Sequence, residues 1–251
     1  MALYKSGNPA FGQNTFAGLP TIAEGEGAMT LQGTVNRIAF LLALVFAGAA
    51  FTWWLFQSTG SFSVVAPFLF AGSFGAFGVG LVLVFRKHWA PYLAVAYAGL
   101  QGLALGGLSA FFEASYPGIA FEALLLTFGI LIALLAAYTL RIVRPSENFK
   151  LIVMSATGGI AVYYLVSLVL SLFGIRVPLI HDNSWVGITF SVVVVIIASL
   201  NLVVDFDFIE QGVQRGAPRY MEWYAAFGIL VTLIWLYIEL LRLLGKSRSR
   251  K

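Results

Sequence analysis

The stretch SWVGITFSVVVVIIASLNLVVDFDFIEQG, from Ser184 to Gly212, decides the fold class of this protein. Its apolar run from Trp185 to Val204 has the roughly 20 residues that a helix needs to cross the hydrocarbon core of a bilayer. Two carboxylates, Asp205 and Asp207, follow at once. Charged groups beside a membrane span are costly to desolvate, so they persist mainly where they face a bundle interior or a watery cavity. The stretch therefore predicts a transmembrane helix and a candidate functional site.

The composition of the whole chain agrees with a membrane protein. Of its 251 residues, 60% are hydrophobic and only 10% are charged, whereas a soluble domain carries about 25% charged residues. There is no cysteine, which excludes disulfides, thiolate metal sites and a cysteine nucleophile. The net charge of +4 suits anionic lipid headgroups, and we expect the lipid bilayer rather than nucleic acid as the partner. A soluble enzyme is excluded.

Seven apolar segments follow a polar, Gly-rich start. We predict an all-α integral membrane protein, a seven-transmembrane-helix bundle, with a flexible polar tail at 1–36, a membrane domain at 37–244 and a basic C-terminal tail at 245–251. The segments run over Arg37–Phe56, Phe62–Phe85, Trp89–Phe112, Gly118–Leu140, Phe149–Phe173, Ser184–Phe208 and Tyr220–Leu244.

The placement of lysine and arginine predicts that the N-terminus is cytoplasmic, because basic residues gather in cytoplasmic loops. We expect the protein in a cell (plasma or inner) membrane. With the N-terminus inside, only Arg176 falls in a loop on the opposite side. The inside set is Lys5, Arg37, Arg86, Lys87, Arg141, Arg144, Lys150, Arg215 and Arg219. The last segment is either a seventh full crossing, which we favour, or a re-entrant one, so the side of Lys251 stays open.

Small residues are dense in the second and third segments, and Gly102 and Gly106 have GxxxG spacing. Such residues let helix backbones approach closely. We predict a packing role for them, with a hinge or a permeation path as the alternative.

Helical spacing distinguishes Asp205 from Asp207 as a candidate site residue in the sixth segment. Asn201 precedes Asp205 by one helical turn, so both project from one face of the helix. We therefore predict this face as a buried polar stripe that senses protons or contacts a cation, with a purely structural hydrogen bond from Asp205 to a neighbouring helix as the alternative. Asp207 points elsewhere, and it is either part of the site or a solvated helix end. We further expect the helix macrodipole to oppose both acids at the C-terminal end of this helix.

Three other acids have structural interpretations. Glu222 lies in the first turn of the last segment, where the helix dipole favours a negative charge. Glu239 stands three residues before Arg242, a spacing that suits an intrahelical ion pair, with a gating role as the alternative. Glu122 lies near the start of the fourth segment and suits a helix-start role.

We predict that the protein is not an enzyme and has no cofactor. The chain has no His-Glu-x-x-His run for zinc and no Gly-x-Ser-x-Gly elbow for a serine nucleophile. A membrane aspartyl protease would need two aspartates on separate helices, whereas Asp205 and Asp207 share one.

Several short motifs, in order along the whole chain, resemble the Bax inhibitor-1 family and its bacterial branch. They are Ser6-Gly7-Asn8-Pro9-Ala10-Phe11, Gly33-Thr34-Val35, the acid-ended sixth segment, Gln214-Arg215-Gly216 followed by Tyr220, and Leu240-Leu241-Arg242-Leu243-Leu244. The resemblance implies a seven-helix bundle whose last helix is central. It also implies pH-sensitive calcium leak, suppression of stress-induced death and, for some bacterial members, modulation of an ATP-dependent membrane protease.

The resemblance also implies a pair of aspartates that share a proton, one near the end of the sixth helix and one in the middle of the last. The first corresponds to Asp205 or Asp207. The place of the second is taken by Thr232, and the acids of the last segment are Glu222 and Glu239 instead. This chain therefore departs from the family pattern at the sensor itself.

We predict a pH-sensitive calcium (cation) leak channel with Asp205, Asp207 and Asn201 as the ion- or proton-sensing residues. Calcium would be a transient, permeant ion held by the oxygens of Asp205 and Asp207. The candidate partners on the last segment are Thr232, Glu239, Arg242 and Glu222. The alternative is a non-conducting regulator of a membrane protease or other membrane complex. A proton-coupled transporter is a third option, but the chain shows no convincing inverted repeat.

Overall fold

The structure is a computed structural model that describes residues 27–174 and 184–250. Seven of its helices are long and apolar enough to cross a membrane, which confirms the predicted seven-helix, all-α membrane fold. The elements are α1 (Leu31–Thr59), α2 (Phe62–Phe85), the short 3₁₀ helix η1 (Lys87–Trp89), α3 (Ala90–Ser115), α4 (Ile119–Thr139), α5 (Glu147–Leu172), α6 (Trp185–Gln214) and α7 (Met221–Arg248). Outside the described residues lie Lys5, Arg176, Lys251 and the motif Ser6-Gly7-Asn8-Pro9-Ala10-Phe11, which supported the predicted topology and the family resemblance.

The first helix begins earlier than predicted. The hydroxyl of Thr30 accepts a hydrogen bond from the backbone N–H of Gly33 at 2.9 Å, which caps the helix so that it begins at Leu31. Residues 31–36, which we assigned to the polar tail, are therefore helical, and residues 1–26 of that tail lie outside the described residues. At the other end, α7 continues to Arg248, so residues 245–248 of the predicted basic tail are helical.

The last segment is one continuous helix with no interruption between Met221 and Arg248. This geometry favours a full crossing over a re-entrant turn. It is also the most deeply buried of the seven spans, with 67% of its apolar window covered.

The described residues divide into two compact units. The α1–α3 unit comprises residues 27–120 and 208–231, and the α4–α5 unit comprises residues 121–174, 184–207 and 232–250. Helices α6 and α7 contribute to both, because each changes unit partway along its length.

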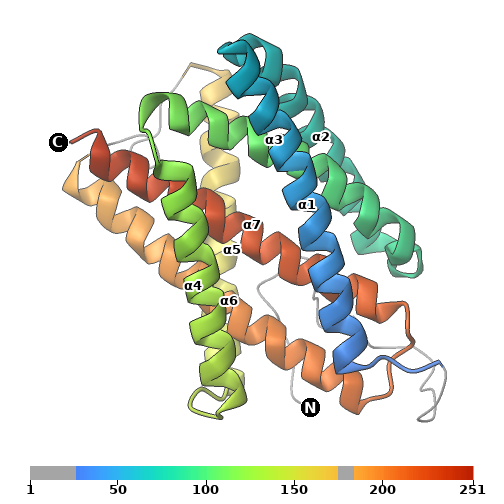
Figure 1. Cartoon of the computed structure of the whole chain (residues 1–251). Coiled ribbons are helices and arrows are strands. Elements are labelled where there is room, and N and C mark those ends of the chain that lie inside the picture. The colour runs from blue at the N-terminus through green and yellow to red at the C-terminus, as the bar shows by residue number, and fades with distance from the viewer. Residues whose placement is uncertain (1–26, 175–183, 251) are drawn as a thin grey trace. The chain divides into compact units, whose positions relative to one another are not determined.

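In the α1–α3 unit, glycines allow the helix backbones to touch. Figure 1 shows α1, α2 and α3 side by side. A Cβ at Gly102 would lie 2.5 Å from the carbonyl oxygen of Val45 in α1, and one at Gly106 would collide with Thr52. A Cβ at Gly72 of α2 would lie 2.5 Å from the carbonyl oxygen of Leu100. The predicted packing role is confirmed for Gly72, Gly102 and Gly106, because no side chain fits where the backbones meet, whereas a Cβ at Gly78 or Gly99 would meet no neighbour within 4 Å.

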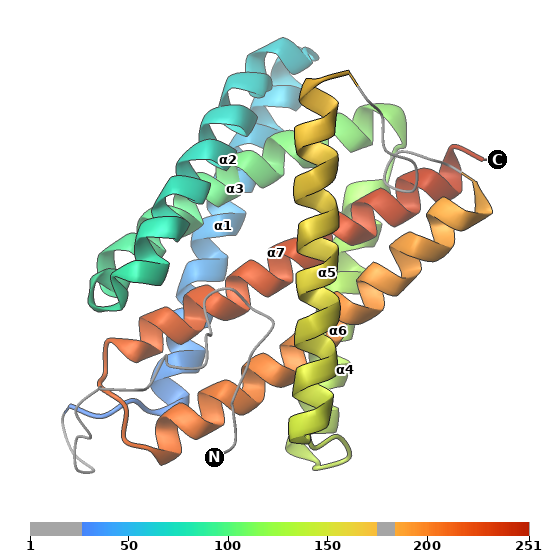
Figure 2. The ribbon, with the colours of Figure 1, turned by 180° about the vertical axis from the view of Figure 1, so that it is seen from behind.

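In the α4–α5 unit, polar side chains join helices whose outer faces are apolar. Figure 2 shows α5 in front of α6 and α7, and hydrogen bonds link α5 to each of them. Only 6% of the apolar window of α5 is buried. Its outward-facing residues, such as Val162, Leu165 and Leu168, are at least 60% exposed, as expected for a surface that lies against lipid.

Candidate functional site

The candidate site is centred on Asp205, which lies within α6 of the α4–α5 unit and is fully buried. The hydroxyl of Thr232 in α7 donates a hydrogen bond of 2.6 Å to Asp205 Oδ2. Thr232 is itself only 2% exposed. The structure thus brings together Asp205, one of the two candidates for the first aspartate of the pair that the resemblance implies, and Thr232, the candidate for the second place.

The position of Asp205 in its helix corrects one prediction. We expected α6 to end near Phe208, with its macrodipole opposing the acids, but the helix continues to Gln214. The dipole effect is confined to the last turn of a helix, so it does not act on Asp205. The prediction was wrong because polar residues after Phe208 continue the helix beyond the apolar run.

Asn201 extends the polar face of α6 by one turn. Its amide nitrogen donates to Thr157 Oγ1 in α5 at 2.7 Å and to the carbonyl of Ile197 at 2.9 Å. Its amide oxygen is buried and has no hydrogen-bond partner. The polar face of α6 therefore contacts threonines of two helices, Thr157 in α5 and Thr232 in α7.

Asp207 has a different environment from Asp205. Its carboxylate lies 2.6 Å from the ammonium of Lys150, in the first turns of α5, and its side chain is 20% exposed. Lys150 is nearly buried and also reaches Glu147 at 3.2 Å. Asp207 is thus an ion-paired residue at the margin of the site and not simply a solvated helix end.

Sequence reasoning missed Lys150 and Thr157 as members of this cluster. Lys150 was counted only toward topology, although it is the one charged residue of the segment Phe149–Phe173. A lone cation in an apolar segment signals a nearby anion, and that signal could have identified it. Thr157 carries no comparable signal, because threonine is common in membrane helices.

The ion pair predicted between Glu239 and Arg242 is present, with a distance of 2.7 Å. Tyr164 of α5 joins it, because its hydroxyl donates to Glu239 Oε1 and accepts from Arg242 at 2.9 Å each. Glu239 is 1% exposed, and its second oxygen has no hydrogen-bond partner. This group ties α5 to α7 and does not include Asp205 among its hydrogen bonds.

The C-terminal end of α7 is held by two more cations. Lys246 is buried and donates to the carbonyl of Gly187 at 3.1 Å and to the hydroxyl of Ser191 at 2.9 Å, both in α6. Arg248 lies 2.6 Å from Glu122 in the first turn of α4. Glu122 therefore makes an interhelical ion pair in addition to its position at the helix start.

Glu222 belongs to the other compact unit. It lies in the first turn of α7, as predicted, and it is 2% exposed. Its carboxylate contacts Thr30 and Arg37 of α1, so its contacts fix the start of α1.

The described residues contain no group of three or more His, Cys, Asp or Glu side chains close enough to hold a metal ion. Asp205 and Asp207, the predicted transient calcium ligands, face different partners, Thr232 and Lys150. The geometry is therefore that of a buried, hydrogen-bonded carboxylate next to an ion pair.

A comparison with protein families places these features in context. The family model described as Bax inhibitor 1 like matches residues 8–249, which is nearly the whole chain. No curated protein gave a significant match. The described part of the chain has seven helices that can span a membrane, and the family match covers nearly the whole chain. The chain is therefore a multi-pass membrane protein that belongs to the Bax inhibitor 1 like family.

Proposed function

We propose that this protein permits slow, proton-regulated passage of cations, with calcium as the permeant ion and Asp205 as the titrating group. The observation that carries the proposal is the fully buried Asp205 carboxylate, which is hydrogen-bonded to Thr232 of another membrane helix. A buried carboxylate has two states of very different solvation cost, because only the ionised form demands compensation by water or a cation.

The contact between Asp205 and Thr232 suggests how protonation regulates passage. The Thr232 hydroxyl can donate to Asp205 in either protonation state, so α6 and α7 stay in contact when the acid is neutral. Ionised Asp205 needs further solvation, and we propose that it draws water and a calcium ion to its hard oxygen atoms. Protonation removes that need, and the path closes.

Asp207 has a supporting role in this proposal. Its pairing with Lys150 at 2.6 Å holds the C-terminal part of α6 against α5. We therefore assign pH sensing to Asp205 and helix positioning to Asp207, which divides between them a role that the sequence predicted for both.

Calcium flux into liposomes that contain the purified full-length chain tests this function. We expect Asp205→Asn to reduce the calcium-dependent dye signal by about tenfold or more, since one lost charge contact corresponds to a few kcal/mol. Glu210→Gln, which removes an acid of the same helix outside the site, is the matched control and should leave the flux unchanged. An unchanged flux in Asp205→Asn would remove the proposed site.

A second function has support from one observation. Asp205 is hydrogen-bonded to a hydroxyl in the place of a second carboxylate, and the described residues form no acidic cluster for a metal. A chain with this arrangement could regulate a membrane protease or another membrane complex without conducting. Deleting residues 1–26 spares every described contact and tests this: loss of a pulled-down partner, together with no calcium flux at any pH in the intact chain, would favour the regulator.

A further inference from the structure

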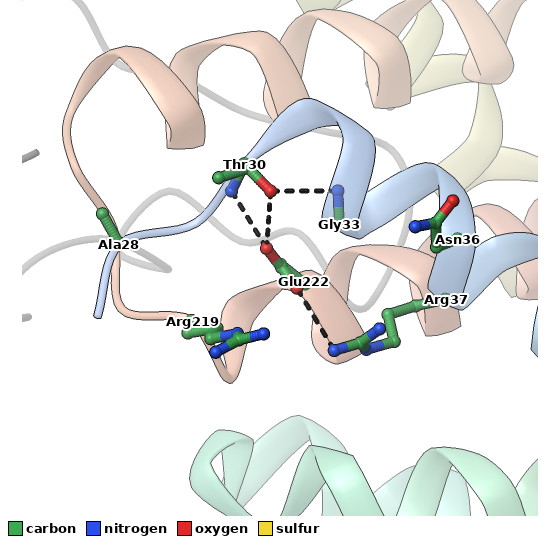
Figure 3. A pocket seen from close by; sticks show the side chains of 7 residues that line it. All are labelled: Ala28, Thr30, Gly33, Asn36, Arg37, Arg219 and Glu222. Carbon is green, nitrogen blue, oxygen red and sulfur yellow. Dashed lines mark hydrogen bonds and ion pairs between the residues drawn. The ribbon is translucent and has the colours of Figure 1, made fainter. Parts of the chain in front are cut away.

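A pocket of about 210 Å³ lies in the α1–α3 unit, where α1 and α7 begin (Figure 3). It does not involve Asp205 or the other polar residues of the α4–α5 unit. Its lining combines one carboxylate, two guanidinium groups and an amide, and consists of Ala28, Thr30, Gly33, Asn36, Arg37, Arg219 and Glu222.

Only one of the two carboxylate oxygen atoms of Glu222 accepts hydrogen bonds. Its Oε1 accepts hydrogen bonds from the backbone N–H of Thr30 at 3.1 Å and from the Thr30 hydroxyl at 2.9 Å. Its Oε2 is buried and has no hydrogen-bond partner, and the Arg37 guanidinium lies 3.7 Å away, beyond hydrogen-bond length. A buried acceptor left in this state costs free energy until a donor arrives.

The guanidinium of Arg37 has a hydrogen-bond donor without an acceptor. Its Nε–H is buried and has no acceptor. The group is held in place because it stacks over the ring of Trp223, with its central carbon 4.8 Å from the ring centroid. The same pocket therefore presents an acceptor without a donor and a donor without an acceptor.

Arg219 supplies a second cation. Figure 3 shows Glu222 between the side chains of Arg219 and Arg37. The side chain of Arg219 is exposed, so it is available to a ligand that enters from the surface. A ligand that complements this lining needs one ammonium group for the carboxylate and one phosphate for the two guanidinium groups.

The position of the pocket in the chain fits a headgroup. It lies where two membrane spans begin, at Leu31 and Met221. The ends of a membrane span lie at the level of the polar headgroups, and Trp223 beside the pocket is a residue type enriched at that level.

From these observations we propose that the pocket binds a phosphoethanolamine group, in which a primary ammonium donates to Glu222 Oε2 and the phosphate accepts from Arg37 and Arg219. A primary ammonium is required because it carries N–H donors, which the trimethylammonium of phosphocholine lacks. The group has two sources with the same chemistry, the headgroup of phosphatidylethanolamine and free O-phosphoethanolamine.

Native mass spectrometry of the full-length chain in detergent tests the proposal by titration with short-chain lipids. We expect phosphatidylethanolamine to bind about tenfold more tightly than phosphatidylcholine or phosphatidylglycerol with the same acyl chains. Free O-phosphoethanolamine is added as a competitor. Displacement of the lipid assigns the site to the free compound as well, and binding of the lipid without displacement assigns it to the membrane. Equal binding of all three lipids would overturn the proposal.

Two variants test whether the preference for phosphatidylethanolamine arises in this pocket. Arg219→Ala should weaken phosphatidylethanolamine binding about tenfold, since it removes one charge-assisted contact. Arg215→Ala is the matched control, because Arg215 is an exposed arginine of the same loop region that does not line the pocket. Glu222→Gln should abolish the preference for ethanolamine over choline. If Glu222→Gln fails to fold, Arg219→Ala still tests the site. Equal affinity of Arg219→Ala and Arg215→Ala would contradict the proposed site.

Discussion

Each compact unit contains a buried carboxylate that accepts a hydrogen bond from a threonine of a different element, the N-cap of α1 in one unit and α7 in the other. In the α1–α3 unit the donor is Thr30 and the acceptor is Glu222, at 2.9 Å, and in the α4–α5 unit Thr232 donates to Asp205 at 2.6 Å. Glu222 lines a surface pocket with two arginines, whereas Asp205 is fully enclosed. Both carboxylates are buried, so what distinguishes them is neighbouring charge and access to a pocket.

The helix position of each acid sharpens the difference. Glu222 lies in the first turn of α7, where the helix dipole stabilises negative charge. Asp205 lies inside α6, away from either end, so no dipole acts on it. Glu222 thus lies beside two arginines and a helix start, whereas Asp205 accepts a hydrogen bond from a hydroxyl inside the bundle.

The largest effect is expected from filling the contact between Gly33 and Glu222. A Cβ at Gly33 would collide with the Glu222 carboxylate, so Gly33→Val displaces this buried side chain from its hydrogen bonds with Thr30. We expect a loss of about 3 kcal/mol in the free energy of unfolding, the upper range for overpacking. Unfolding in mixed SDS micelles measures it, with Gly99→Val as control because a Cβ at Gly99 meets no neighbour within 4 Å. Equal stability of both variants would contradict the contact.

Removing the Thr232 hydroxyl, which donates to Asp205, should have the next largest effect on the free energy of unfolding. Thr232→Val keeps the shape of the side chain but leaves Asp205 without the hydroxyl. We expect a loss of about 2 kcal/mol at neutral pH, which is typical of a hydrogen bond to a charged group. The loss should shrink at low pH, where Asp205 is neutral and its desolvation is less costly. A loss independent of pH would argue that Asp205 does not change protonation over that range.

The corresponding removal of the Thr30 hydroxyl, which donates to Glu222, should cause the smallest loss in the free energy of unfolding. Thr30→Val removes a helix cap and one donor, but Glu222 Oε1 keeps the backbone N–H of residue 30 at 3.1 Å. We expect a loss of about 1 kcal/mol, the usual value for a cap, and thermal unfolding in detergent measures it. A loss as large as that of Thr232→Val would show that the two pairs do not differ as proposed.

Much of the fold follows from the sequence, because seven apolar segments leave few alternatives. The bounds of α2 agree with the predicted segment Phe62–Phe85, since Gly60 and Arg86 flank an uninterrupted apolar run. The ends of α1, α6 and α7 were misplaced, because hydropathy marks the membrane and not the helix. A helix continues into water wherever a cap such as Thr30 or a helix-compatible polar run such as that after Phe208 supports it.

The candidate site was only partly predictable. Helical spacing put Asn201 and Asp205 on one face, and the resemblance to the family indicated Thr232 opposite. Lys150 and Tyr164 were not expected as partners, because their roles depend on which helix faces which. The pocket at Glu222 also depends on three-dimensional contacts between residues far apart in the chain, such as Thr30 and Glu222.

The pH profile of calcium flux in liposomes, compared between the natural chain and Asp205→Asn, tests the central claim most directly. The ionised carboxylate favours passage in our account, so flux through the natural chain should rise with pH as Asp205 loses its proton. The Asp205→Asn chain should show low flux with no such rise. The same rise in both chains would contradict the account, because another group would then control passage.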